Sequence, residues 1–283
     1  MSKKRKWKRC FTAYSAAIVV LFSATVPAYA LENKTDTIWG SVPASVYITK
    51  EFYEGENTIE IPKKYFDAIE EDITTKEKAI NAFWEAQRQS CYLYGDRSVS
   101  VTVGSDTVTI TRNPYYDLET ESAMRSTVEA EAEKVLDRIL YNGMSDYEKA
   151  RAIYNYVRQT STYDWDAYNA IVGEDCHGNI SKWAKAVSAY GVLIDGKSVC
   201  QGDAQAYTLL ARKAGLTTMM ATGKMQNGGG HAWNRVWCNS QWYEVDCCFE
   251  EFCPSFEIYT ANTGVTYGGV GIMESSTDSY YGV

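Results

Sequence analysis

Two strand-like runs joined by a two-residue turn constrain the fold of this chain more than any other feature. The runs are residues 231–238 (HAWNRVWC) and 241–248 (QWYEVDCC), and residues 239–240 lie between them. A turn of two residues leaves one pairing of the strands, because every residue then faces a single partner. This pairing places Arg235 opposite Glu244, which is a favourable cross-strand pair. The pattern predicts an antiparallel β-hairpin.

The same pairing brings a histidine and an acid to one face of the hairpin. Side chains alternate along a strand, so His231 and Asp246 become diagonal neighbours with backbones about 7–8 Å apart, which two side chains can bridge. A slip of one residue would put them on opposite faces. The pairing of Trp237 with Trp242 supports the register independently. A carboxylate can therefore orient an imidazole here.

A helix that begins at a cysteine precedes this hairpin. Residues 201–214 have apolar side chains at helical spacing, and Gly215 follows where a C-terminal cap is expected. Cys200 is therefore expected at or near the helix N-terminus, where free backbone N–H groups and the helix dipole favour a thiolate. For a single cysteine, burial or a disulfide is the commoner role.

A thiol, an imidazole and a carboxylate together form a catalytic triad when each activates or holds the next. The sequence predicts such a triad from Cys200, His231 and Asp246. Residues 227–230 (NGGG) precede the histidine and allow close approach or movement of the backbone. Two other interpretations remain open, a structural strand histidine and an acid that only ends its strand.

Several sequence blocks resemble the core domain of the transglutaminase-like superfamily, in its order and close to its spacing. They are GVL at 191–193, GKSVCQG at 196–202, LL at 209–210, AGL at 214–216, Gly223, HAWNxV at 231–236 and WYxVD at 242–246. The resemblance covers roughly residues 144–262. It implies an α+β, papain-like fold with the nucleophile helix packed on an antiparallel sheet. It also implies Cys200 as nucleophile, His231 as base and Asp246 as orienting acid.

The chain departs from the family pattern at two places. Asp203 stands where many relatives have an aromatic residue, and residues 247–249 (CCF) replace the small residue, threonine and aromatic that often follow the acid. The oxyanion donor is open, and the backbone N–H of Cys200 is a natural candidate. Further oxyanion or substrate-binding candidates are Tyr190, Gln201 and Trp233. Tyr190 is equally well explained as a core residue.

The N-terminus has the pattern of a secretory signal peptide. Six basic residues within residues 3–9 precede an apolar stretch at 11–26, and residues 28–30 (AYA) fit a cleavage site. The alternative is an uncleaved anchor, but the stretch is shorter than the roughly 20 residues that span a bilayer. We expect a secreted or cell-surface protein. Removing six of the 28 basic residues leaves 22 against 36 acidic ones, a charge of −14, which argues against nucleic acid or an anionic membrane as partner.

The rest of the chain is expected to form a smaller mixed α/β region over 31–115 and the catalytic core over 116–283. The expected elements are a strand at 58–61, a helix at 76–88, a hairpin of 98–103 with 107–111, a helix at 119–140, a capping box at Ser145 and Glu148 that starts another helix, a loop at 161–182 and a surface tail at 264–283.

Seven cysteines remain after cleavage, and an odd number in an exported protein indicates one unpaired thiol. They are Cys91, Cys176, Cys200, Cys238, Cys247, Cys248 and Cys253. No two C-x-x-C pairs occur and only His177 and His231 are available, so a structural zinc site is not expected. Glu250, Glu251 and Glu257 indicate a solvated acidic face rather than a calcium site. The predicted chemistry requires no cofactor.

The resemblance implies acyl transfer at a peptide or protein amide, either by hydrolysis or by cross-linking of a glutamine to an amine. Hydrolysis is favoured because water is the default acceptor, and the acidic surface weakly favours basic or neutral substrates. The alternative is a non-catalytic binding or scaffolding module at the cell surface. That alternative predicts Cys200 in a disulfide or buried away from His231, whereas an enzyme requires a free thiol.

Overall fold

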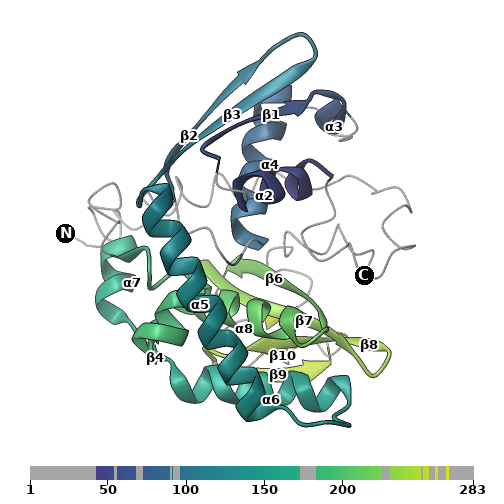
Figure 1. The fold of residues 1–283 in the computed structure, drawn as a ribbon. Coiled ribbons are helices and arrows are strands. Elements are labelled where there is room, and N and C mark those ends of the chain that lie inside the picture. The colour runs from purple at the N-terminus through teal and green to yellow at the C-terminus, as the bar shows by residue number, and fades with distance from the viewer. Residues whose placement is uncertain are drawn as a thin grey trace, which may run out of the picture.

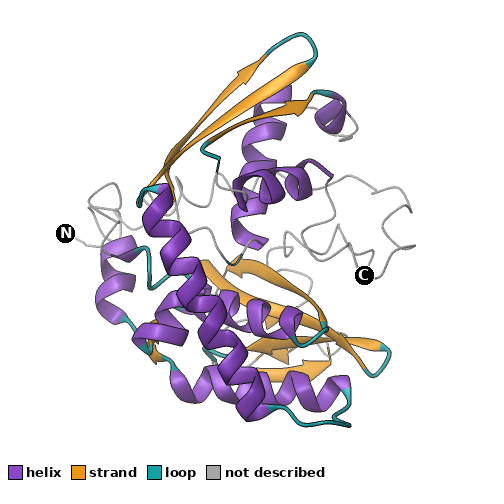
Figure 2. Cartoon of the chain, viewed as in Figure 1, coloured by secondary structure: helices purple, strands orange, loops and turns teal. Residues whose placement is uncertain are grey.

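The structure is a computed structural model that describes residues 43–53, 56–67, 73–89, 91, 96–172, 183–224, 230–249, 251–254, 259–260 and 266–267. The expected signal peptide, Cys176, His177 and nearly all of the tail from residue 264 lie outside the described residues, as do the side chains of the three glutamates at 250, 251 and 257. The described residues form two main sheets, of three and four strands, with helices packed on each, and two further strand pairs (Figures 1 and 2).

The smaller part holds three helices and a three-stranded antiparallel sheet. Its elements are α2 (Pro43–Tyr53), β1 (Thr58–Pro62), α3 (Lys64–Asp67), α4 (Thr75–Gln89), β2 (Asp96–Val103) and β3 (Thr107–Pro114), with strand order β1-β3-β2. The predicted strand, helix and hairpin of this region are confirmed, and Val103 pairs with Val108 across the hairpin turn. Alternate residues of β3, including Val108 and Ile110, are buried against Phe83 of α4 and form a separate hydrophobic cluster.

The larger part is built around a four-stranded antiparallel sheet with order β6-β7-β8-β9. Its elements are α5 (Leu118–Ile139), α6 (Asp146–Thr160), β4 (Thr162–Tyr163), α7 (Trp165–Val172), the π-helical turn η5 (Gly191–Asp195), β5 (Lys197–Ser198), α8 (Cys200–Lys213), β6 (Thr217–Lys224), β7 (Gly230–Cys238), β8 (Gln241–Asp246) and β9 (Glu251–Pro254); β10 (Tyr259–Thr260) pairs with β11 (Thr266–Tyr267). The expected α+β class is confirmed.

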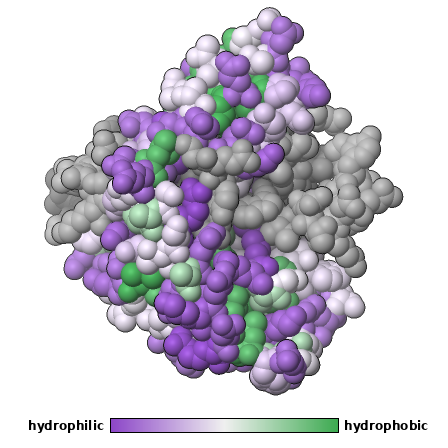
Figure 3. Space-filling view, viewed as in Figure 1, coloured by the Kyte–Doolittle hydropathy of each residue, from purple (hydrophilic) through white to green (hydrophobic). Residues whose placement is uncertain are grey.

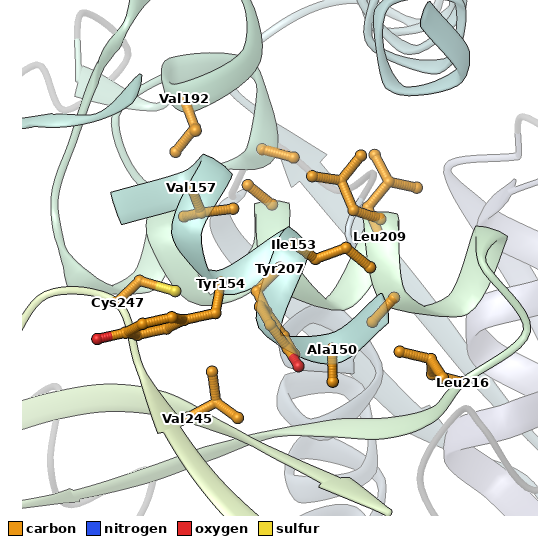
Figure 4. Close-up of a cluster of buried hydrophobic side chains, with 14 of the residues drawn as sticks. Ala150, Ile153, Tyr154, Val157, Val192, Tyr207, Leu209, Leu216, Val245 and Cys247 are labelled. Carbon is orange, nitrogen blue, oxygen red and sulfur yellow. The ribbon is translucent and has the colours of Figure 1, made fainter. Parts of the chain in front are cut away.

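Helix α8 lies at the centre of this part. Its residues from 202 to 211 are all buried, which is typical of a helix surrounded by other elements. Figure 4 shows Ile153 of α6, Tyr207 of α8 and Val245 of β8 packed in one cluster. Full burial of each such side chain stabilises the fold by about 1.5–3 kcal/mol. The beginning of α8 is therefore fixed by packing along the whole helix.

The predicted register of the hairpin from β7 and β8 is confirmed. Arg235 pairs with Glu244, and Trp237 pairs with Trp242. The turn residues have positive φ angles, 50° at Asn239 and 62° at Ser240. Two consecutive left-handed residues are characteristic of the type I′ turn, whose twist matches that of the strands it joins.

The expected loop over residues 161–182 is wrong in its first half. Residues 162–163 pair in parallel with 197–198, and residues 165–172 form α7. The Asp164 side chain accepts a hydrogen bond from the backbone N–H of Ala167 at 2.9 Å and caps this helix. Tyr168 and Ile171 then pack with Trp183 on a small hydrophobic cluster. The strand partner is distant in sequence, so local pattern could not reveal it.

The outer surface is mainly polar on the face drawn in Figure 3, where hydrophobic side chains of the described residues form only small, separate patches.

The two parts of the chain meet through a buried arginine. Arg112 of β3 donates from Nε to Asp96 of β2 at 2.8 Å, and its two terminal nitrogens contact the Glu121 carboxylate of α5 at 2.9 and 2.7 Å. All three side chains are almost fully buried.

We predict that Arg112→Ala lowers the free energy of unfolding by about 3–5 kcal/mol, because it leaves two buried carboxyl groups without their cation. Urea denaturation measures the change. Lys134→Ala is the control, since it removes an exposed ion pair of 3.2 Å with Glu131 and should cost less than about 1 kcal/mol. Equal effects of the two substitutions would show that the Arg112 cluster does not hold the two parts together.

Candidate active site

Cys200 is the first residue of α8. The preceding Val199 has an extended backbone, with φ −102° and ψ 175°, and no side chain caps the helix. Free N–H groups of the first turn therefore surround the cysteine, and together with the helix dipole they favour a negatively charged sulfur. The Cys200 thiol is half-buried and is not part of a disulfide. This satisfies one requirement of the predicted nucleophile.

Close packing fixes the position of this helix start. The backbone N–H of Val199 donates to the carbonyl of Ala186 at 3.0 Å. A side chain at Gly202 would collide with the same carbonyl and would lie 2.8 Å from Cβ of Ser198. Only glycine allows the segment containing Ala186 to approach so closely.

His231 and Asp246 are joined by a short hydrogen bond. His231 lies near the start of β7 and Asp246 at the end of β8, and their side chains are almost completely buried. The His231 Nε2 atom is 2.5 Å from Oδ2 of Asp246. The other oxygen, Oδ1, accepts hydrogen bonds from the backbone N–H groups of Cys248 and Phe249, each at 3.0 Å. The turn after β8 thus fixes the position of the Asp246 carboxylate, and this carboxylate in turn orients the His231 imidazole.

The thiol of Cys200 lies beside this imidazole. Cys200 packs on Ala204 of its own helix and on Met220 and Ala232 of the sheet, and Ala232 is the neighbour of the histidine. The side chain of Cys200 is also close enough to His231 to raise the pKa of the imidazole. Since Nε2 faces Asp246, Nδ1 is the ring nitrogen available to the sulfur. The structure brings the three predicted triad residues together from α8, β7 and β8.

The surroundings favour a protonated imidazole. Burial by itself would lower the pKa of His231, but the charge and hydrogen bond of Asp246 and the nearby Cys200 outweigh it and raise the pKa to about 10. An imidazolium beside a cysteine is an arrangement that can stabilise a thiolate. Because the pKa of His231 is raised, protonation of this residue stabilises the fold. This stabilisation is complete at pH values below the ordinary pKa near 6.5 and is lost as pH rises through about 10.

Comparison with known families agrees with this geometry. The family model of the transglutaminase-like superfamily matches residues 133–247, which include all three residues. Residues 133–247 are therefore similar to this superfamily. A search of curated proteins finds no match.

Two solved structures are similar to parts of the chain. One is a TGase with 20% identity and a TM-score of 0.36, and the match covers 54% of this chain and 44% of that one. The chain thus spans less than half of the TGase. The other is a candidate cysteine protease from Cytophaga hutchinsonii with 10% identity and a TM-score of 0.32, and the match covers 63% and 73% of the respective chains.

Trp233 supports the histidine from the same strand. Its indole is nearly parallel to the His231 ring, with centroids 5.9 Å apart and an interplanar angle of 15°. The indole N–H donates to Glu244 at 2.5 Å, and the same carboxylate accepts from Arg235 at 2.7 Å. Trp233 is only 2% exposed, so it is placed to orient the imidazole rather than to form an open substrate surface.

Asn234 is a positioning residue that sequence reasoning missed. Its buried amide nitrogen donates to the carbonyl of Ala204 at 3.0 Å and to the hydroxyl of Thr208 at 2.7 Å, both on α8. It also reaches the carbonyl of Met219 on β6 at 3.3 Å. The strand that carries the base is thus tied to the helix that carries the thiol. An asparagine inside a buried strand was the available signal, because this residue is depleted in strands.

The remaining sequence candidates lie in different settings. Gln201 follows Cys200 and is half-buried. Tyr190 packs at the edge of the main core, with the Lys185 ammonium 4.4 Å from the centre of its ring. Their roles as oxyanion or substrate-binding residues stay predictions.

An aromatic surface borders the nucleophile. Tyr163 pairs with Ser198, two residues before Cys200, and its ring lies 4.7 Å from that of Trp165, which is 63% exposed. Tyr168 contacts both rings. Burial, followed by the nearby Cys200, raises the pKa of each tyrosine in this group.

The residues that the structure describes include no group of three or more His, Cys, Asp or Glu side chains able to hold a metal ion. None of the described helices is long and apolar enough to cross a membrane.

We predict that Asp246→Asn slows alkylation of Cys200 at pH 6 by about tenfold or more, since each unit by which the pKa of His231 falls costs about 1.4 kcal/mol of imidazolium stability. The rate constant for iodoacetamide labelling measures the effect. Asp137→Asn, which changes an exposed acid of α5, is the matched control and should leave the rate unchanged. If Asp246→Asn reacts as fast as this control, Asp246 has no part in activating the thiol.

Proposed function

We propose that this protein is an exported, cysteine-dependent acyl-transfer enzyme that acts on peptide or protein amides. One observation carries the proposal: a free thiol at an uncapped helix N-terminus lies beside a buried imidazole, and a carboxylate forms a hydrogen bond with that imidazole. The match of residues 133–247 to the transglutaminase-like superfamily supports a cysteine enzyme in general. Export is proposed from the N-terminal sequence alone.

In the proposed reaction, the Cys200 proton passes to Nδ1 of His231 and the sulfur attacks the amide carbonyl carbon. Charge then develops on the carbonyl oxygen, and the backbone N–H of Cys200 is a candidate donor to it. The imidazolium returns its proton to the leaving amine, and a thioester remains on the sulfur. His231 next takes a proton from the acceptor that attacks the thioester, and the carbon–sulfur bond breaks, which releases the acyl product and restores the thiolate beside the imidazolium. Asp246 keeps the ring oriented through both steps.

We propose water as the acceptor, so that the overall reaction is hydrolysis. Transfer of a glutamine acyl group to an amine would use the same thioester, and the product distinguishes the two reactions. A non-catalytic binding or scaffolding module is the second candidate. The free thiol and its position beside His231 favour the enzyme, because a scaffold has no need of this arrangement.

We predict that iodoacetamide labels Cys200 rapidly at pH 5.5 without prior reduction, because the imidazolium stabilises the thiolate at that pH. Peptide mapping by mass spectrometry identifies the labelled residue. Burial raises the pKa of Cys238 to about 11 and also raises those of Cys247 and Cys248, so these thiols should stay unlabelled and act as internal controls. Cys200→Ala should abolish the signal. Labelling that begins only above pH 8 would contradict the proposal.

The acyl acceptor is identified with glutamine-containing peptides, incubated with and without a fluorescent primary amine. We expect products whose mass shows cleavage or deamidation by water, with no incorporated amine and no activity in Cys200→Ala. Incorporation of the amine in place of water would replace hydrolysis by cross-linking. If Cys200 labels rapidly but the peptides give no product with or without the amine, the acyl donor must be of another kind.

A further inference from the structure

A second acid is buried beside the nucleophile. Asp203 lies three residues after Cys200 in α8, and this spacing places the two side chains on neighbouring positions of the helix surface. It is only 5% exposed. Its Oδ1 accepts a hydrogen bond from the hydroxyl of Ser198 at 2.5 Å, and this hydroxyl is 2.7 Å from that of Ser161. The chain Ser161–Ser198–Asp203 therefore connects the end of α6 to the turn that precedes the thiol.

This carboxylate has no cationic partner of its own among the described lysines and arginines. The groups that face it come from every neighbouring element: Ser161 after α6, Tyr163 of β4, Ser198 of β5, His231 of β7, Asp246 of β8, and Cys247 and Cys248 of the following turn. Of these, only the protonated His231 carries positive charge. A buried carboxylate without a close cation is costly, so its presence calls for a role.

We propose that Asp203 is a second acid of the site, which positions the turn before Cys200 through Ser198 and, when ionised, stabilises the imidazolium of His231. The inference rests on the proposed function, since it concerns activation of the same thiol. Asp246 orients the ring by direct contact. Asp203 acts at longer range, by its charge and by holding the backbone from which the sulfur projects.

The proposal has a definite pH dependence. Burial is the largest influence on the pKa of Asp203 and raises it, and the nearby charge of Asp246 raises it further. The hydrogen bonds from Ser198 and Ser161 and the charge of His231 lower it. The resulting pKa is about 6. Reactivity of Cys200 should therefore rise in a step as pH increases through about 6. The folded protein binds this proton more tightly than the unfolded chain, so ionisation of Asp203 destabilises the fold as pH rises through about 6.

The test compares wild type with Asp203→Asn, which keeps the size of the side chain and its acceptor oxygen for Ser198. We expect the step near pH 6 in the alkylation rate of Cys200 to disappear and the rate at pH 7.5 to fall about three- to tenfold. The urea midpoint of the variant, relative to wild type, should rise between pH 5 and pH 8. A purely structural residue would lower the midpoint at every pH and leave the shape of the rate profile unchanged, and this result would overturn the inference.

Ser198→Ala provides a second variant that keeps the acid. It removes a hydrogen bond to the ionised carboxylate, so the step in reactivity should move to higher pH, and an unmoved step would contradict the proposal even if Asp203→Asn failed to fold. Glu133→Gln, which changes an exposed acid, is the control and should match wild type. Absence of any labelling of wild-type Cys200 at acidic pH defeats the proposed function, whereas normal labelling with no step near pH 6 defeats only the role of Asp203.

Discussion

The hydrogen bond between His231 and Asp246 is the interaction on which the rest of the site depends. It joins two adjacent strands of a buried hairpin, and the backbone of the turn after β8 holds the opposite oxygen of the carboxylate. With Nε2 engaged in this way, the other ring nitrogen is left for the sulfur at the head of α8. The burial that makes this pair costly in isolation also makes its electrostatic interaction strong.

Two elements bring the sulfur to that ring. Helix α8 is enclosed along its length, so small movements of its first turn would disturb a well-packed core. Asn234 of β7 then donates three hydrogen bonds, two to α8 and one to β6, which connect these three elements. The smaller sheet adds rigidity at a distance, because buried Arg112 joins it to α5. The position of the thiol thus depends on buried side chains outside the predicted triad.

Much of this site could be predicted from local pattern, because a two-residue turn leaves one hairpin register and apolar spacing reveals a helix that starts at Cys200. Prediction failed where the deciding partner was distant in sequence. Helix α7 depends on a strand pair with residues 197–198, and the role of Asn234 depends on carbonyls of α8 and β6. Asp203 was noticed only as a departure from a family pattern, since its burial and its serine partners are properties of the folded chain.

The type I′ turn at residues 239–240 has a consequence for how this protein can vary. Surface loops usually tolerate insertions and deletions. Here one added residue would change which side chains of β7 and β8 share a face, and the base would lose its acid although neither residue had been altered. A length change at the outer tip of the hairpin would then act as an active-site mutation. Homologous proteins that keep this histidine and this aspartate should therefore conserve the number of residues between them more strictly than the identities of those residues.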